Sequence, residues 1–228
     1  MTSVALAEEL LLLAYDDETG KATGSRIGLD LGMAAAVLVE LALAGRLRLD
    51  GNSIVALNPA PTGEPIADEV LGRVAADTPH TPASWVQRLR HGLRDRVLSD
   101  LVSRGVIRDV DETAMEHIHV HRYPVVDRTV ERDIRERLTA ALATDDAPDE
   151  RTAALATLLA AVRMEPVLGF TGAQAEAAHQ RLKEIGSRAG FTGESSLEDS
   201  TVRPSVAIAV AALMKAIETA LGRAPARP

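Results

Sequence analysis

The sequence predicts a mainly α-helical fold, and two features of its composition lead to that prediction. Of its 228 residues, 46% are hydrophobic but only 2% are aromatic. Alanine, the commonest residue, is the best helix former and is depleted in strands. This composition argues against a β-sandwich or barrel and favours tightly packed helices with small contact residues. The length allows a core of its own, and we expect one domain over residues 1–222 with a flexible tail at 223–228.

The first half of the chain predicts helices around one short hairpin. Apolar residues alternate on either side of Asp50-Gly51-Asn52, which predicts a hairpin there. Gly45 ends the helix before it. Thr81-Pro82 is suited to cap and open a later helix, which has a break near Gly92. The predicted helices span 5–14, 30–44, 65–76 and 81–104, and the second is apolar on nearly every face.

The second half predicts another hairpin and four more helices, which makes eight helices in all. The hairpin strands are predicted at 106–110 and 116–121. Thr171 to Gln174 fits a capping box, which indicates a helix start. The predicted helices span 128–143, 151–162, 171–188 and 204–221.

Several function classes are excluded or disfavoured by the residues themselves. The chain has no cysteine, so disulfides and thiolate sites are excluded. A net charge of -8 disfavours nucleic acid as a partner. Residues 1–13 lack the basic start of a signal peptide, and no apolar run reaches the ~18 residues of a membrane span, the run 206–214 being too short. We therefore expect a cytoplasmic protein, at most peripheral on the inner face of the membrane.

Catalytic motifs are missing as well. Residues 20–24 lack the spacing of a phosphate-binding loop, and no serine lies in a nucleophile elbow. Asp68 and Glu69 are adjacent, so they point to different faces of their helix. We expect neither an enzyme nor a cofactor.

A basic stretch at 88–108 is the first candidate site. Its six arginines against two aspartates give a local charge of +4 in an acidic protein. Arg90, His91 and Arg94 share one face if they lie on one helix. Guanidinium groups offer planar donors matched to phosphate oxygens. The alternative is a solvated helix face paired with nearby carboxylates.

The second candidate is a run of three histidines. His117, His119 and His121 alternate, so on a strand their imidazoles share a face and resemble half of a metal site. No further carboxylate is placed to complete a site. The alternative is the polar outer face of a hairpin with Ile118 and Val120 toward the core.

Several segments in order resemble the Golgi phosphoprotein 3 family, in particular its bacterial, actinobacterial-type members. The segments that carry the resemblance are 8–14 (EELLLLA), 39–47 (VELALAGRL), 60–63 (APTG), 84–86 (SWV), 93–97 (LRDRV), 101–106 (LVSRGV) and 151–155 (RTAAL). The resemblance implies a central helical bundle with peripheral amphipathic helices and two small hairpins. It also implies a membrane adaptor that binds the phosphatidylinositol 4-phosphate headgroup and retains enzymes through their cytosolic tails.

The family's headgroup residues match this sequence in part. Of the family's arginine pair, the second member falls on Arg94 and the first on His91. The arginine of the second helix falls on Ala34, and the family tryptophan falls near Ser25, with Arg26 beside it. The residues themselves suggest a rearranged anion site made of Arg26, Arg90, His91 and Arg94. The family's apolar hairpin tip corresponds here to residues 115–121, which are far more polar.

Three hypotheses follow. The first is a peripheral adaptor for an anionic, phosphoinositide-like phospholipid headgroup, with cytosolic tails of membrane proteins as further partners. The second is a soluble protein-interaction scaffold of the same fold without the lipid site. The third is a metal-dependent enzyme that uses His117, His119 and His121. The sequence leaves the oligomeric state open.

Overall fold

The computed structural model describes residues 4–17, 19–114, 118–191 and 204–222, with the backbone alone described at 112–114 and 118–120. In these residues helices dominate, and the strands form only two antiparallel pairs, which confirms the mainly α prediction. The helices are α1 (Leu6–Ala14), α2 (Arg26–Leu43), α3 (Pro65–Ala76), α4 (Pro82–Leu89), α5 (Leu93–Ser103), α6 (Arg128–Ala143), α7 (Glu150–Ala161), α8 (Gly172–Arg188) and α9 (Pro204–Gly222), with a 3-10 turn, η1 (Glu165–Leu168), before α8.

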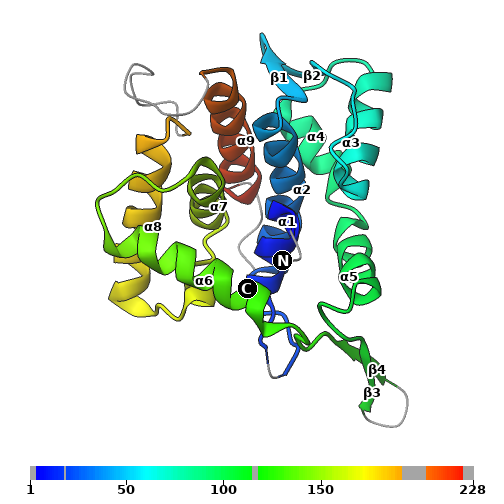
Figure 1. The fold of residues 1–228 in the computed structure, drawn as a ribbon, viewed down its shortest axis with the longest axis vertical. Helices are drawn as coiled ribbons and strands as arrows, with labels where there is room; N and C mark the ends of the chain where they lie inside the picture. The colour runs from blue at the N-terminus through cyan, green and yellow to red at the C-terminus, as the bar shows by residue number, and fades with distance from the viewer. Residues whose placement is uncertain (1–3, 18, 115–117, 192–203, 223–228) are drawn as a thin grey trace.

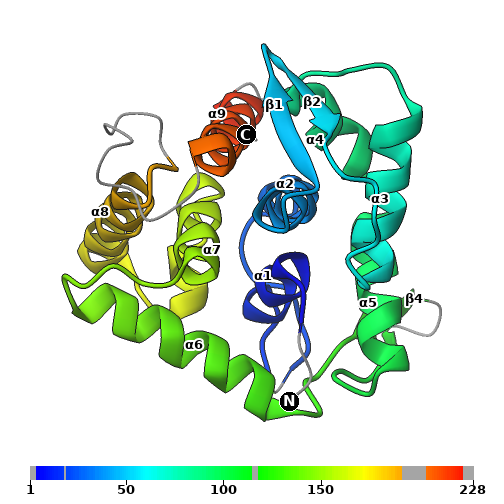
Figure 2. The ribbon, with the colours of Figure 1, turned by 45° about the horizontal axis from the view of Figure 1, so that its top comes forward.

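Helix α2 is the centre of the bundle. It packs against α1, α3, α4, α5, α7 and α9 (Figures 1 and 2). Thirteen of its 18 residues are buried, as its apolar faces predicted. Ala34, Ala35 and Ala36 are fully buried, so small side chains occupy its middle turns. The aromatic-poor composition thus corresponds to helices that approach closely through alanine.

Helix α9 corrects the expectation that no apolar segment of this chain is long enough to span a membrane. Its 19 residues are long and apolar enough to cross a membrane by length and composition, although the run 206–214 alone is too short. In the structure it packs on α2, α4 and α7. Val206, Val210, Leu213 and Ile217 lie on the buried face, so α9 serves here as a core helix of the bundle.

The two hairpins lie at opposite ends of the bundle (Figure 1). Strands β1 (Leu47–Asp50) and β2 (Ser53–Ala56) pair around the predicted turn. Strands β3 (Val110–Ala114) and β4 (Ile118–Arg122) form the second hairpin. The loop between α1 and α2 lies at the β3–β4 end, because the amide of Tyr123 donates to the carbonyl of Gly20 at 3.0 Å.

Two predicted boundaries and one predicted capping contact were wrong. Helix α2 begins at Arg26 instead of Asp30, because Ser25 caps it by accepting from the amide of Gly28 at 3.1 Å. The first strand of the second hairpin lies at 110–114 instead of 106–110. The hydroxyl of Thr171 makes no capping hydrogen bond at the start of α8.

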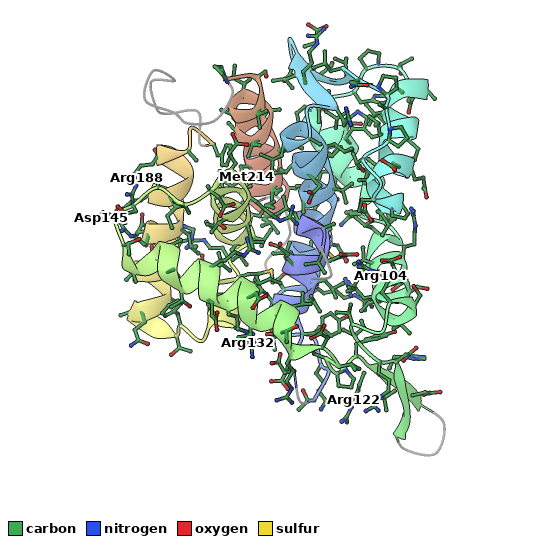
Figure 3. All side chains as sticks on the ribbon, in the orientation of Figure 1. Arg104, Arg122, Arg132, Asp145, Arg188 and Met214 are labelled. Carbon is green, nitrogen blue, oxygen red and sulfur yellow. The ribbon has the colours of Figure 1, made fainter. Side chains whose placement is uncertain are left out.

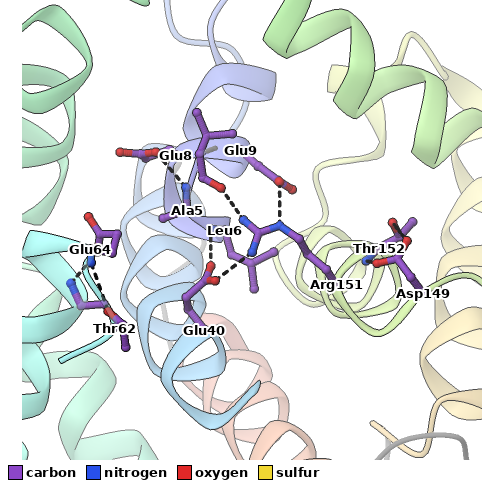
Figure 4. A network of polar contacts seen from close by, with 12 residues as sticks. Ala5, Leu6, Glu8, Glu9, Glu40, Thr62, Glu64, Asp149, Arg151 and Thr152 are labelled. Atoms are coloured by element: carbon purple, nitrogen blue, oxygen red, sulfur yellow. Dashed lines mark hydrogen bonds and ion pairs between the residues drawn. The ribbon is translucent and has the colours of Figure 1, made fainter. Parts of the chain in front are cut away.

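A buried ion network joins α1, α2 and α7 (Figure 4). The guanidinium of Arg151 donates to Glu9 Oε1 at 2.9 Å and to Glu40 Oε1 at 2.8 Å, and it also reaches the carbonyl of Val4. Glu40 Oε2 accepts from the amide of Leu6 at 2.7 Å. Burial raises the pKa of Glu9, and the neighbouring arginines oppose that rise. The network fixes the start of α1 to the bundle.

Candidate anion-binding site at the start of α2

The first turn of α2 is positively charged. A helix N-terminus has unpaired N–H groups and the positive end of the helix dipole. The exposed Arg26 is the first residue of α2, and the first turn has no acidic residue. A cation at this end of a helix is unfavourable by about 0.3–1 kcal/mol, and a bound anion reverses that sign.

Arg94 reaches the same turn from α5. Its Nη2 forms an ion pair with Asp30 Oδ1 and lies 3.4 Å from the carbonyl oxygen of Arg26. Its side chain is only 11% exposed, and its Nε is buried without a hydrogen-bond partner. The structure therefore brings Arg26 and Arg94 together, but Asp30 on the second turn balances part of their charge.

Tyr15 is a third member that the sequence analysis missed. It follows α1 directly and pairs with Ala22 across the loop that leads to α2. Burial raises the pKa of Tyr15, whereas the nearby guanidinium groups of Arg94 and Arg26 lower it. Its hydroxyl therefore stays protonated near neutral pH and lies beside both arginines. The only signal in the sequence was a tyrosine at the end of a helix in a chain that has few aromatics.

Arg90 and His91 do not share a helical face with Arg94. Helix α4 ends at Leu89, and Gly92 adopts a φ of +74°, so the chain turns before α5 begins. The predicted break near Gly92 is confirmed, and the predicted shared face is wrong. Arg90 is half-buried with an unpartnered Nε, and His91 is exposed.

The two other family positions have structural roles. Ala34 is fully buried in the middle of α2, where no side chain reaches solvent. Ser25 is the N-cap of α2. A headgroup site in this chain therefore rests on Arg26, Arg94 and Tyr15.

The histidine run is described only at one position. His117 and the side chain of His119 lie outside the described residues. His121 Nδ1 lies 2.9 Å from Asp109 Oδ1, and this contact raises the pKa of His121. Its ring stacks on Tyr123 with centroids 6.4 Å apart. Within the part of the chain that the structure describes, no three acidic or histidine side chains gather as a metal site would need.

Arginines from two other elements lie at the same end of the molecule as the site. Arg122 and Arg132 lie at the end where the second hairpin and the α1–α2 loop meet (Figure 3). Ile27, the residue after Arg26, is 45% exposed.

The sequence pattern of the Golgi phosphoprotein 3 (GPP34) family matches residues 6–220. The chain belongs to that family. Membership indicates a Golgi phosphoprotein-like binding role, and the family is one of adaptors.

Proposed function

We propose that this protein is a peripheral membrane adaptor that binds an anionic phospholipid headgroup at the start of α2. The observation that supports the proposal best is the convergence of Arg26 and Arg94 on a first turn without a carboxylate. A phosphate there would accept from backbone N–H groups and from Arg26, as anions do at helix N-termini. The hydroxyl of Tyr15 supplies a further donor.

The lipid surface would be held by several weak contacts. Each basic side chain near an anionic surface contributes about 1 kcal/mol. The exposed Ile27 offers an apolar contact beside Arg26. A protein with a net charge of -8 gains nothing from long-range attraction, so this end must face the membrane.

One observation favours a second candidate, a protein-interaction scaffold without lipid binding. Asp30 forms an ion pair with Arg94 inside the protein. Because Arg94 already has Asp30 as its partner, a phosphate must compete with that carboxylate and binds Arg94 less favourably.

Vesicle co-sedimentation tests the proposal and separates the two candidates. The probes are phosphatidylcholine vesicles alone and vesicles with a small fraction of phosphatidylinositol monophosphate. Under the adaptor hypothesis Arg26→Gln weakens binding to the anionic vesicles about fivefold. Asp30→Asn strengthens it, because Arg94 is released from its internal partner. Arg73→Gln, an exposed arginine in the last turn of α3, is the matched control and leaves binding unchanged.

The outcomes are distinct. Equal binding to neutral and anionic vesicles, or none to either by wild type and Asp30→Asn alike, contradicts the adaptor hypothesis. In the second case, a pulldown with cytosolic tails of membrane proteins that is independent of lipid supports the scaffold.

A further inference from the structure

The loop between α1 and α2 is a compact turn fixed to its surroundings at two places. Within the turn, Asp16 Oδ1 accepts from the amide of Thr19 at 2.7 Å, and the Asp16 carbonyl accepts from Gly20 at 2.8 Å. Gly20 packs against residue 123, and a Cβ there would lie 2.5 Å from the Tyr123 nitrogen. With its φ of +62°, this position requires glycine. The other attachment is to α6.

That second attachment is a pair of carboxyl groups. Asp17 and Glu131 line the same pocket, and a hydrogen bond with Asp17 is one cause of the raised pKa of Glu131. Asp17 Oδ1 and Glu131 Oε2 are both buried, and neither has a hydrogen-bond partner among the residues that the structure describes. The side chain of Glu131 is only 2% exposed. Two carboxylates in contact repel each other when both are ionised, whereas one shared proton supplies the missing donor.

One cation contacts this pair, and it uses the other oxygen of Glu131. Arg135 Nε donates to Glu131 Oε1 at 2.6 Å. The same guanidinium donates to the carbonyl of Val167 in η1 at 2.7 Å, which fixes its position. Arg135 therefore leaves Glu131 Oε2 for Asp17.

Other charged groups around the pair are engaged elsewhere or lie on the rim. The pair lines a pocket of about 710 Å³, whose wall also includes Arg128, Arg132 and Glu136. Arg132 Nε lies 3.7 Å from Glu136 Oε1, and both are well exposed. From the neighbouring helices, Glu9 of α1 contacts Arg137 and Arg151. Arg181 of α8 contacts Asp145 and Glu184.

We propose that Asp17 and Glu131 form a proton-operated latch, in which one shared proton holds the α1–α2 loop against α6 and its loss releases the loop. The loop also forms part of a second pocket of about 440 Å³, through Tyr15, Asp16, Thr23 and Gly24. The loop therefore lines both pockets, and its release would change the lining of each. The latch goes beyond the lipid site and does not depend on it.

The direction of the pH dependence follows from linkage. Burial, and then the hydrogen bond with Asp17, raise the pKa of Glu131 from 4.5 to about 7, although the contact with Arg135 lowers it. The closed loop therefore binds a proton that the open loop releases. Closure is favoured below the ordinary glutamate pKa and is lost as pH rises through about 7.

Hydrogen exchange of the loop amides tests the latch. Exchange is measured by mass spectrometry from about pH 6 to pH 8, corrected for the intrinsic exchange rate. In wild type, protection of residues 15–25 should fall by up to about tenfold per pH unit above the midpoint. In Asp17→Asn the side-chain amide donates to Glu131 at every pH, so protection should stay high and flat. Glu136→Gln, a carboxylate on the rim of the same pocket, should keep the wild-type profile.

Each result of this experiment supports or contradicts the latch. A flat wild-type profile overturns the latch, and so does an unchanged slope in Asp17→Asn. If Glu136→Gln loses the pH dependence of protection, the proton belongs to Glu136 and not to the Asp17–Glu131 pair, which contradicts the latch. Protection of α2 amides in every variant verifies that the fold is intact. Asp17→Ala should leave the loop open at every pH, since it removes the partner altogether.

Discussion

Replacing Arg151 by methionine tests how far the bundle depends on its buried ion network. Methionine keeps much of the apolar stem and removes the charge. The change leaves Glu9 with Arg137 alone, and it leaves Glu40 with only the amide of Leu6. Glu9 is 2% exposed, so water does not replace the missing guanidinium.

The magnitude follows from the environment of the network. Removing one partner of a buried ion pair costs about 3–5 kcal/mol. Arg151 itself is 30% exposed, and Glu9 keeps one arginine, which places the expected loss near the lower end, at about 3 kcal/mol. A loss of that size is a large share of the about 5–15 kcal/mol that stabilises a domain. The double variant Arg151→Met with Glu40→Gln should recover part of it, because it removes one uncompensated charge.

Urea denaturation measures the effect. Trp85, the single tryptophan, is 1% exposed and reports unfolding by fluorescence, and far-ultraviolet circular dichroism reports loss of helix. Arg48→Met is the control, since Arg48 is 41% exposed and pairs with the exposed Asp50. That control should lose no more than about 0.5 kcal/mol. If Arg151→Met loses no more than Arg48→Met, the network does not hold the bundle together.

Two further predictions concern packing and protonation. Gly186→Ala should destabilise by about 1–3 kcal/mol, because a Cβ would lie 2.5 Å from Thr157 Oγ1, whereas Gly72→Ala in open space should stabilise by about 0.5–1 kcal/mol in the same urea assay. His121 should titrate above an ordinary histidine by NMR, since Asp109 raises its pKa; the charged contact is present at low pH and is lost as pH rises through that raised value. Asp109→Asn should lower the pKa of His121, and an unchanged value would show that the contact is absent in solution.

Local patterns predicted the helices well where they were periodic and capped. The helix predicted over 65–76 is α3, and it buries Ile66, Val70 and Val74 along one face. The start of α2 was missed because glycines and an arginine precede its apolar run, and the hydroxyl that caps it belongs to Ser25.

The ion network could not be predicted from local patterns. Glu9 and Arg151 are 142 residues apart in the sequence. Adjacent glutamates near the start of a chain usually indicate a solvated helix end, yet both Glu8 and Glu9 are buried. Their partners lie directly after α5 and on α6 and α7, so only the tertiary fold identifies them.

At the candidate site, local sequence spacing predicted a cluster that the tertiary structure does not form. The basic stretch predicted an arginine cluster on one helix, but the turn at Gly92 separates Arg90 from Arg94. What brings a second arginine to Arg94 is the extra turn at the start of α2, which places the carbonyl of Arg26 beside it. Asp30, on the next turn of the same helix, forms an ion pair with Arg94, so α2 both assembles the site and reduces its charge. Lipid binding in this chain is therefore a competition between Asp30 and a phosphate for Arg94, and Asp30→Asn measures that competition more directly than the removal of either arginine.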